Sequence, residues 1–174
     1  ISSGWVKVRR LSGDKDMTLA VLGRGDFFGE MAILDESPRS TDVIALSNVE
    51  LFSISAQRFI QTLFKDAQLH HRLLQLMVKR IRTNNIRLQL RRKPPAIKLA
   101  YTLASLAQQY GQQVDDGYEM ANLPPQDLAD ISEINNADDV KKLMDKLTEK
   151  KWLEVDGTGR VLKLLNLRQL AQLA

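Results

Sequence analysis

The sequence predicts an α+β protein with a β-rich first third, a long helix, and a last third that mixes helices with short strands. Apolar residues alternate with polar ones in the first third and then recur every three or four residues up to about residue 92. The pair Pro94-Pro95 ends this helical pattern, because proline lacks the amide hydrogen that a helix needs. We therefore divide the chain into residues 1–66, 67–93 and 94–174.

Short strands are expected in the first third. Alternating Met17, Leu19 and Val21 are the clearest of them. The sequence opens at Ile1, without an initiator methionine, on what already reads as a strand, so we expect the true N-terminus to be missing. The expected strands, separated by polar turns, cover residues 5–8, 17–22, 43–45 and 49–54.

Two helices are expected in the middle of the chain. Ser55 is a suitable N-cap for a short amphipathic helix, and a longer helix follows from about Ala67 to Arg92. Five residues of the longer helix recur at spacings of 3, 4, 3 and 4, as in the seam of a coiled coil. This seam predicts either a dimer interface or packing of the helix on its own domain. Its members are Leu74, Met77, Ile81, Asn84 and Leu88.

The last third has the element order of a winged helix-turn-helix. A helix over 96–110 is followed by a hairpin with its turn at 115–117 and by a short helix around Leu128. A second helix then carries an apolar stripe, and a strand, a turn and another strand follow after Trp152. Helix, turn, helix and β-ribbon in this order predict a winged helix-turn-helix domain over 94–174.

Composition excludes several kinds of chemistry. The chain of 174 residues is 44 % hydrophobic, which is typical of a folded protein, and no apolar run approaches the roughly 20 residues that span a bilayer. It has no cysteine, and its two histidines, His70 and His71, make a poor metal site. We find no nucleophile–base pair. The sequence therefore predicts a cytoplasmic protein that is not an enzyme and has no metal site, cofactor or membrane contact.

The formal charge of +4 is unevenly distributed. Residues 67–114 contain nine Lys/Arg and no Asp/Glu, whereas residues 115–174 contain eight Lys/Arg and twelve Asp/Glu. The acidic last third opposes binding to DNA. The basic residues between Arg87 and Lys98 either support DNA binding or form a solvated helix face, and we favour the second interpretation.

The most informative stretch runs from Gly25 to Thr41. It combines a glycine-flanked turn, a single acid at Glu30, small and apolar residues, and Arg39 nine residues beyond the acid. Small residues let backbone amides approach an anion, and an arginine offers phosphate a two-pronged donor. A carboxylate repels phosphate but accepts from a hydroxyl, so one site with both side chains fits a sugar phosphate. The alternative is a surface turn with an incidental Glu30–Arg39 salt bridge.

This stretch resembles the phosphate-binding cassette of cyclic-nucleotide-binding domains, which reads F-G-E-[LIM]-A-[LI] and then P-R-[ST]-[AT]. The resemblance implies that Glu30 accepts from the ribose 2′-hydroxyl, that Arg39 and Ser40 hold the cyclic phosphate, and that nearby backbone amides assist. It implies a cyclic nucleotide, with cAMP the first expectation, as effector rather than cofactor. The implied ligand-binding residues in the cassette are Gly29, Glu30, Met31, Ala32, Arg39, Ser40 and Thr41.

The layout of the whole chain resembles the CRP/FNR regulators, in which a β-roll, a long dimerisation helix and a winged helix follow one another. The family's first strands are missing here before Gly4. In that family polar residues of the long helix contact the base, and Asn84 and Asn85 match those positions; the alternative is an Asn that only fixes helix register. The implied dimer residues are Leu74, Met77, Ile81 and Leu88.

The helix that would read DNA departs from the family's S-R-E-T-V-x-R pattern. Ala137 stands for the first arginine, Asp138 for the glutamate and Lys142 for the second arginine. Arginine to guanine is the commonest specific base contact, and alanine cannot make it. The residues left to contact DNA are Asn135, Asn136, Asp138, Lys141, Lys142 and Arg160.

Two functions of different classes follow. The first is a cyclic-nucleotide-responsive transcription regulator that binds double-stranded DNA as a homodimer. The second is a ligand-sensing dimer whose winged helix binds a protein partner. We favour the first, because winged helices behind such sensors generally bind DNA in this family.

Overall fold

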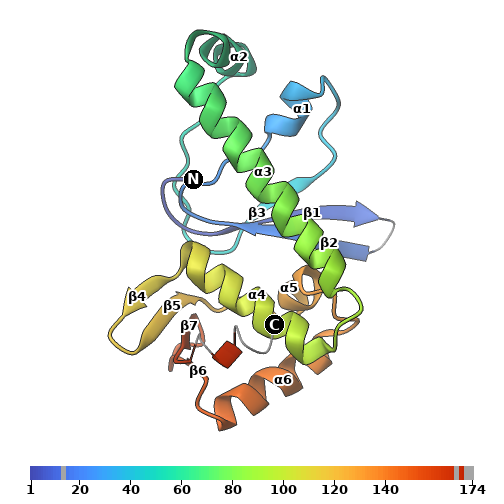
Figure 1. Cartoon of the computed structure of the whole chain (residues 1–174), viewed down its shortest axis with the longest axis vertical. Coiled ribbons are helices and arrows are strands. Elements are labelled where there is room, and N and C mark those ends of the chain that lie inside the picture. The colour runs from blue at the N-terminus through green and yellow to red at the C-terminus, as the bar shows by residue number, and fades with distance from the viewer. Residues whose placement is uncertain (13–14, 167–168, 171–174) are drawn as a thin grey trace.

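The computed structural model of the protein describes residues 1–12, 15–166 and 169–170, and it has the expected α+β architecture (Figure 1). No helix in these ranges has the length and apolar character to cross a membrane. In chain order the elements are β1 (Val6–Ser12), β2 (Lys15–Leu22), α1 (Glu30–Leu34), β3 (Asp42–Ala45), α2 (Ala56–Lys65), α3 (Ala67–Leu90), α4 (Pro95–Tyr110), β4 (Gln112–Val114), β5 (Gly117–Ala121), α5 (Pro125–Ile131), α6 (Ala137–Glu149), β6 (Leu153–Val155) and β7 (Val161–Leu164).

The first sheet is antiparallel, with the strand order β2-β1-β3. The prediction of a strand over residues 49–54 was wrong. Within the described residues this segment makes one isolated bridge, between Glu50 and Ser3, and no strand ladder, so its backbone lacks the paired hydrogen bonds of a strand. Phe52, in this segment, is 89 % exposed.

The middle helices begin and end close to where the sequence predicts. The Ser55 hydroxyl accepts from the amide of Arg58 at 3.3 Å, which is the expected N-cap of α2. Asp66 caps α3 in the same way, and α3 runs to Leu90, two residues short of the predicted end. Pro94 then caps α4.

The C-terminal module is a winged helix-turn-helix. Its sheet has the order β4-β5-β7-β6, and α4, α5 and α6 pack with it around a common core. The predicted stripe of α6 faces this core: Val140 is fully buried, and the three partly buried residues packed beside it are Leu143, Met144 and Leu147. Other fully buried members of this core are Leu99, Leu103, Leu128, Ile131, Leu153, Leu162 and Leu164.

The two modules touch through α4 as well as through α5. The ring of Tyr110, at the end of α4, meets Trp5 edge to face with centroids 5.1 Å apart, and its hydroxyl donates to the Asp26 carboxylate. Gly23 permits this approach, because a Cβ there would lie 2.7 Å from the Tyr110 ring. Helix α3 connects the modules and passes in front of the first sheet in Figure 1.

Candidate ligand site

The cassette is built around a left-handed glycine. Gly29 has φ 86° and caps α1, and a Cβ at this position would lie 2.3 Å from Nη1 of Arg39. Arg39 instead donates from Nη1 to the Gly29 carbonyl at 2.8 Å. Glycine is therefore needed both for the backbone conformation and for the close approach of the guanidinium.

Glu30 is buried and paired with a residue that the sequence analysis missed. Its side chain is 4 % exposed, and one carboxylate oxygen accepts from Nη1 of Arg80 on α3. Arg80 also donates to the carbonyl of Phe27, and its guanidinium lies 4.8 Å from the centroid of that ring. The incidental Glu30–Arg39 bridge that we weighed as an alternative is thus wrong, since the partner of Glu30 is Arg80.

A signal for Arg80 was present in the sequence. It lies four residues before Asn84, so one turn of helix brings both to the same face of α3. It also belongs to the stretch of basic residues without acids. The sequence does not distinguish the basic residues of that stretch from one another, and only tertiary packing shows which of them are paired.

The cassette opens onto a cavity of about 1030 Å³ between the first sheet, α3 and α4. Helix α3 brings Lys79, Arg80 and Arg87 to this cavity. Arg87 donates to the Leu19 carbonyl at 2.8 Å, and burial lowers its pKa. The sequence-predicted ligand residues that line the cavity are Gly29, Glu30, Met31, Ala32, Arg39, Ser40, Thr41 and Asn84.

The two asparagines of α3 lie differently. Both are exposed, but Asn84 lines the cavity, whereas Asn85 is not among its described lining residues. Successive helix residues point about 100° apart, so neighbours cannot share one face. Within one chain, Asn84 alone of the pair is in reach of a ligand bound in the cavity.

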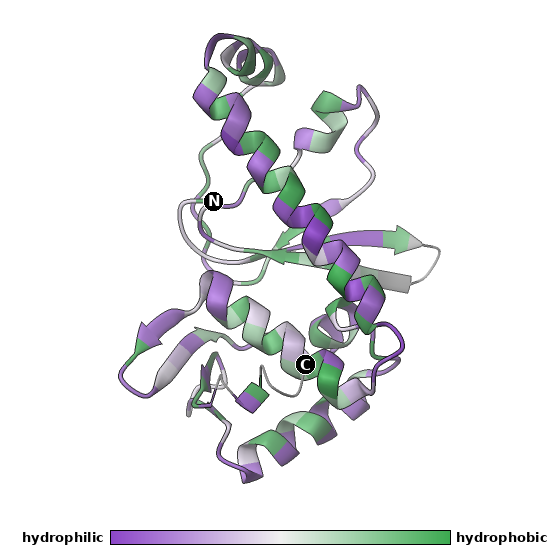
Figure 2. Cartoon of the chain, in the orientation of Figure 1, coloured by the Kyte–Doolittle hydropathy of each residue, from purple (hydrophilic) through white to green (hydrophobic). Residues whose placement is uncertain are grey.

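An apolar face of α3 is exposed among the residues that the structure describes. Leu74, Ile81 and Leu88 are each more than half exposed, and Val78, which was not predicted, is 48 % exposed. Met77 is half-buried. Figure 2 shows hydrophobic and hydrophilic residues alternating along this helix rather than a wholly polar surface.

The predicted DNA-contacting residues gather at the start of α6 and on the β6–β7 turn. Asn136 caps α6, and its side chain accepts from the amide of Asp139 at 2.8 Å. Lys141 donates to Asp138 at 3.2 Å, and both are exposed. Asn135, Lys142 and Arg160 are exposed as well. Two of the six predicted residues therefore already pair with each other, and a third is engaged as a cap.

Comparison with known proteins agrees with this architecture. Residues 1–66 match the family model of the cyclic nucleotide-binding domain. The Cyclic AMP receptor protein of Thermus thermophilus is 32 % identical over 111 residues, which are 63 % of this chain and 51 % of that protein. The CRP-like cAMP-activated global transcriptional regulator of Mycobacterium tuberculosis is 25 % identical over 160 residues, which are 90 % of this chain and 71 % of that protein.

The solved structure of FixK2 from Bradyrhizobium japonicum has the same fold. It superposes with a TM-score of 0.80 at 21 % identity, over 99 % of this chain and 84 % of that one. The chain spans about half the length of the Thermus relative. In the order of its parts, a cyclic nucleotide-binding domain, a long helix and a winged helix-turn-helix, the chain is similar to the CRP-like transcription regulators.

Proposed function

We propose that the protein is a transcription regulator controlled by a cyclic nucleotide, with cAMP as the first candidate. The observation that carries this proposal is that one cavity is lined both by the buried Glu30, which pairs with Arg80, and by the Arg39 guanidinium, which is held against Gly29. A carboxylate and a guanidinium on one site match a ligand that has both a hydroxyl and a phosphate.

The proposed binding mode assigns each group one task. Arg39 and the Ser40 hydroxyl donate to the cyclic phosphate, and Glu30 accepts from the ribose hydroxyl. Arg80 neutralises the buried Glu30, so that its charge does not repel the phosphate. Asn84 offers a donor and an acceptor to the base edge.

Fewer observations support cAMP in particular than support a site for a ribose and a phosphate. The cassette contacts only ribose and phosphate, which cAMP and cGMP share. The Asn84 amide can pair with either purine, because it both donates and accepts. Competition between the two nucleotides decides between them, and we expect cAMP to bind more tightly.

Calorimetry with cAMP tests the binding site. We expect Arg39→Ala to weaken binding by about 2–5 kcal/mol, because the variant leaves the phosphate without its charged partner. Arg82→Ala is the matched control, since Arg82 is exposed on α3 and does not line the cavity in the described chain. Equal affinity in wild type and Arg39→Ala would contradict the proposal.

We propose further that the protein binds double-stranded DNA as a homodimer, mainly through phosphate contacts. The recognition helix lacks both family arginines, and Asn136 is engaged as its N-cap. Lys142 and Arg160 are exposed and suit phosphate. We expect weak base discrimination, with dissociation constants of roughly 10⁻⁴ to 10⁻⁶ M at physiological salt.

Selection from random duplexes in the presence of cAMP tests this second part. Recovery of one sharp palindromic site would show that α6 reads bases after all. Absence of binding even at low salt would favour the alternative, a winged helix that binds a protein partner. The observation that supports the alternative is the acidic start of α6, where Asp138 and Asp139 precede its first lysine.

A further inference from the structure

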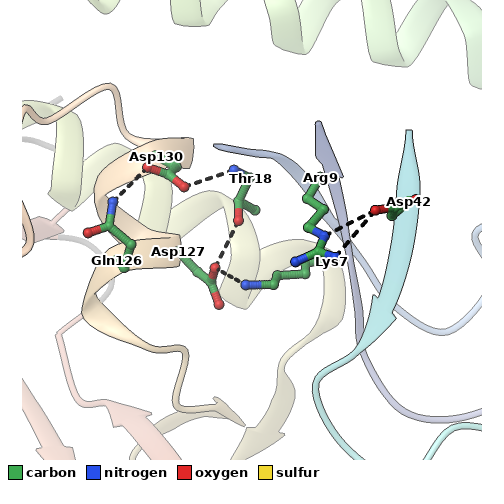
Figure 3. Close-up of polar contacts among 7 residues, drawn as sticks. All are labelled: Lys7, Arg9, Thr18, Asp42, Gln126, Asp127 and Asp130. Carbon is green, nitrogen blue, oxygen red and sulfur yellow. Dashed lines mark hydrogen bonds and ion pairs between the residues drawn. The ribbon is translucent and has the colours of Figure 1, made fainter. Parts of the chain in front are cut away.

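A second polar cluster lies where α5 meets the first sheet (Figure 3). In the described sheet β2 is an edge strand, and α5 packs against it. An edge strand exposes backbone groups that need a partner. The amide of Thr18, in β2, donates to Oδ2 of Asp130 at 2.8 Å, so α5 supplies that partner from the other module.

Asp127 is the centre of this cluster. Its Oδ1 accepts from Nζ of Lys7 at 2.7 Å and from the hydroxyl of Thr18 at 2.8 Å. Asp127 is 2 % exposed and Thr18 is 3 % exposed. The other carboxylate oxygen, Oδ2, is buried without a hydrogen-bond partner among the described residues.

These hydrogen bonds favour one particular position of α5 on β2. A buried carboxylate is tolerated only while charged or polar partners face it, and here Lys7 and Thr18, its partners, both belong to the first sheet. Undocking would return Asp127, including its unpartnered oxygen, to water. The desolvation of the carboxylate therefore offsets part of what its pairing contributes, and the docked and undocked states differ less in free energy than they would across an apolar contact.

The position of α5 gives the contact a consequence for α6. The two helices share one core, in which Leu128 and Ile131 of α5 and Val140 of α6 are fully buried. They consequently move as one body. The angle at which α5 lies on β2 thus sets the direction of the recognition helix relative to α3, the helix proposed to form the dimer.

We propose that Lys7, Thr18, Asp127 and Asp130 form a docking latch that positions the recognition helix, and that opening the latch releases the winged module from the sheet. Asp127 is a positioning residue: none of the four latch residues lines the cavity as described. The consequence for DNA binding rests on the proposed function, whereas the docking itself does not.

Distance measurement on the full chain tests the docking. The sequence has no cysteine, so spin labels can be attached at Gln61→Cys on α2 and Asp145→Cys on α6, which are both exposed. The labelled chain is mixed with an excess of unlabelled chain, so that a homodimer carries one labelled protomer. We expect one narrow distance distribution in the parent and a broad or shifted one after Asp127→Asn. The matched control is Asp42→Asn, which removes the carboxylate of an ion pair, Arg9–Asp42 at 3.3 Å, within the first sheet.

Amide hydrogen exchange at Thr18 gives a second, local readout. Asp130, the partner of this amide, is intact in Asp127→Asn, so loss of the side-chain pairing alone does not expose the amide. We expect the Thr18 amide to exchange about tenfold faster, because the whole latch opens more often. In Asp42→Asn the rate should stay unchanged.

A third measurement separates positioning from general damage. We expect latch variants to keep the cAMP affinity of the parent and to bind a mixed-sequence duplex about tenfold more weakly at low salt, since undocked recognition helices no longer share one orientation. If the parent protein itself does not bind the duplex, the proposed function fails, and the distance measurement still decides on the latch.

Unchanged distances and unchanged Thr18 exchange in the variants would overturn the proposal. If Asp127→Asn does not fold, Lys7→Met decides instead. The Lys7 side chain is 18 % exposed, and methionine keeps its aliphatic stem while removing the charge. A narrow, parent-like distribution in Lys7→Met would equally reject the latch.

Discussion

Arg80 links the cassette to the long helix α3, and the contribution of its ion pair with Glu30 to stability can be isolated. Arg80→Ala leaves Glu30 buried and unpaired, and we expect it to lower the free energy of unfolding by about 3 kcal/mol. Glu30→Gln in the Arg80→Ala background should restore part of this loss, because a neutral amide is less costly to bury. Urea denaturation of the four proteins of this cycle is the measurement, and a strictly additive cycle would show that the two side chains do not interact.

Tyr110 introduces a dependence of stability on alkaline pH. Burial and the hydrogen bond to Asp26 raise the pKa of its phenol above the ordinary value of about 10. The folded chain therefore holds this proton more tightly than the unfolded chain, so the stabilisation is complete below about pH 10 and is lost as the pH rises further. We expect the difference in unfolding free energy between wild type and Tyr110→Phe to shrink above that pH, measured by urea denaturation from pH 8 to 11. A constant difference would contradict it.

At the scale of one element, α3 presents apolar side chains that no described residue of the same chain covers. Ile81 and Leu88 are 58 % and 61 % exposed, and symmetric pairing of two α3 helices would bury them. We expect Ile81→Asp with Leu88→Asp to convert a dimer to a monomer in light scattering. Gln75→Asp with Gln89→Asp is the control, since both residues are exposed polar positions of the same helix. A wild type that is monomeric at tens of micromolar, roughly the range of weak association, would remove the basis of this prediction.

At the scale of the whole molecule, the proposed binding to DNA through phosphate contacts should be sensitive to salt. Each phosphate contact contributes a slope of about −0.9 to the logarithm of affinity against the logarithm of salt concentration. We expect Lys142→Ala to reduce this slope by about 1 and to weaken binding to all sequences alike. Lys65→Ala, at the end of α2, should leave the slope unchanged. Fluorescence anisotropy from 50 to 200 mM salt measures it, and an effect confined to one sequence would show base reading by Lys142 instead.

Local signals in the sequence determined most of the elements. Ser55 and the Pro94-Pro95 pair bounded the helices because caps and prolines act on adjacent residues. The apolar stripe of α6 could be predicted because its residues recur at the period of a helix and are the ones that face the core. The strand expected over residues 49–54 had the right composition, but a strand also needs a partner along its edge, and composition cannot supply one.

The candidate ligand site could be predicted from the sequence only where its residues are neighbours in the chain. Glu30 and Arg39 belong to one contiguous motif, so their chemistry could be read directly. The tertiary structure decided that Arg80, fifty residues from Glu30, is its partner, and that Asp127 docks on Lys7 across 120 residues. Such pairings depend on how helices pack on sheets, and a basic stretch or an isolated aspartate looks the same in the sequence whether it is paired or solvated.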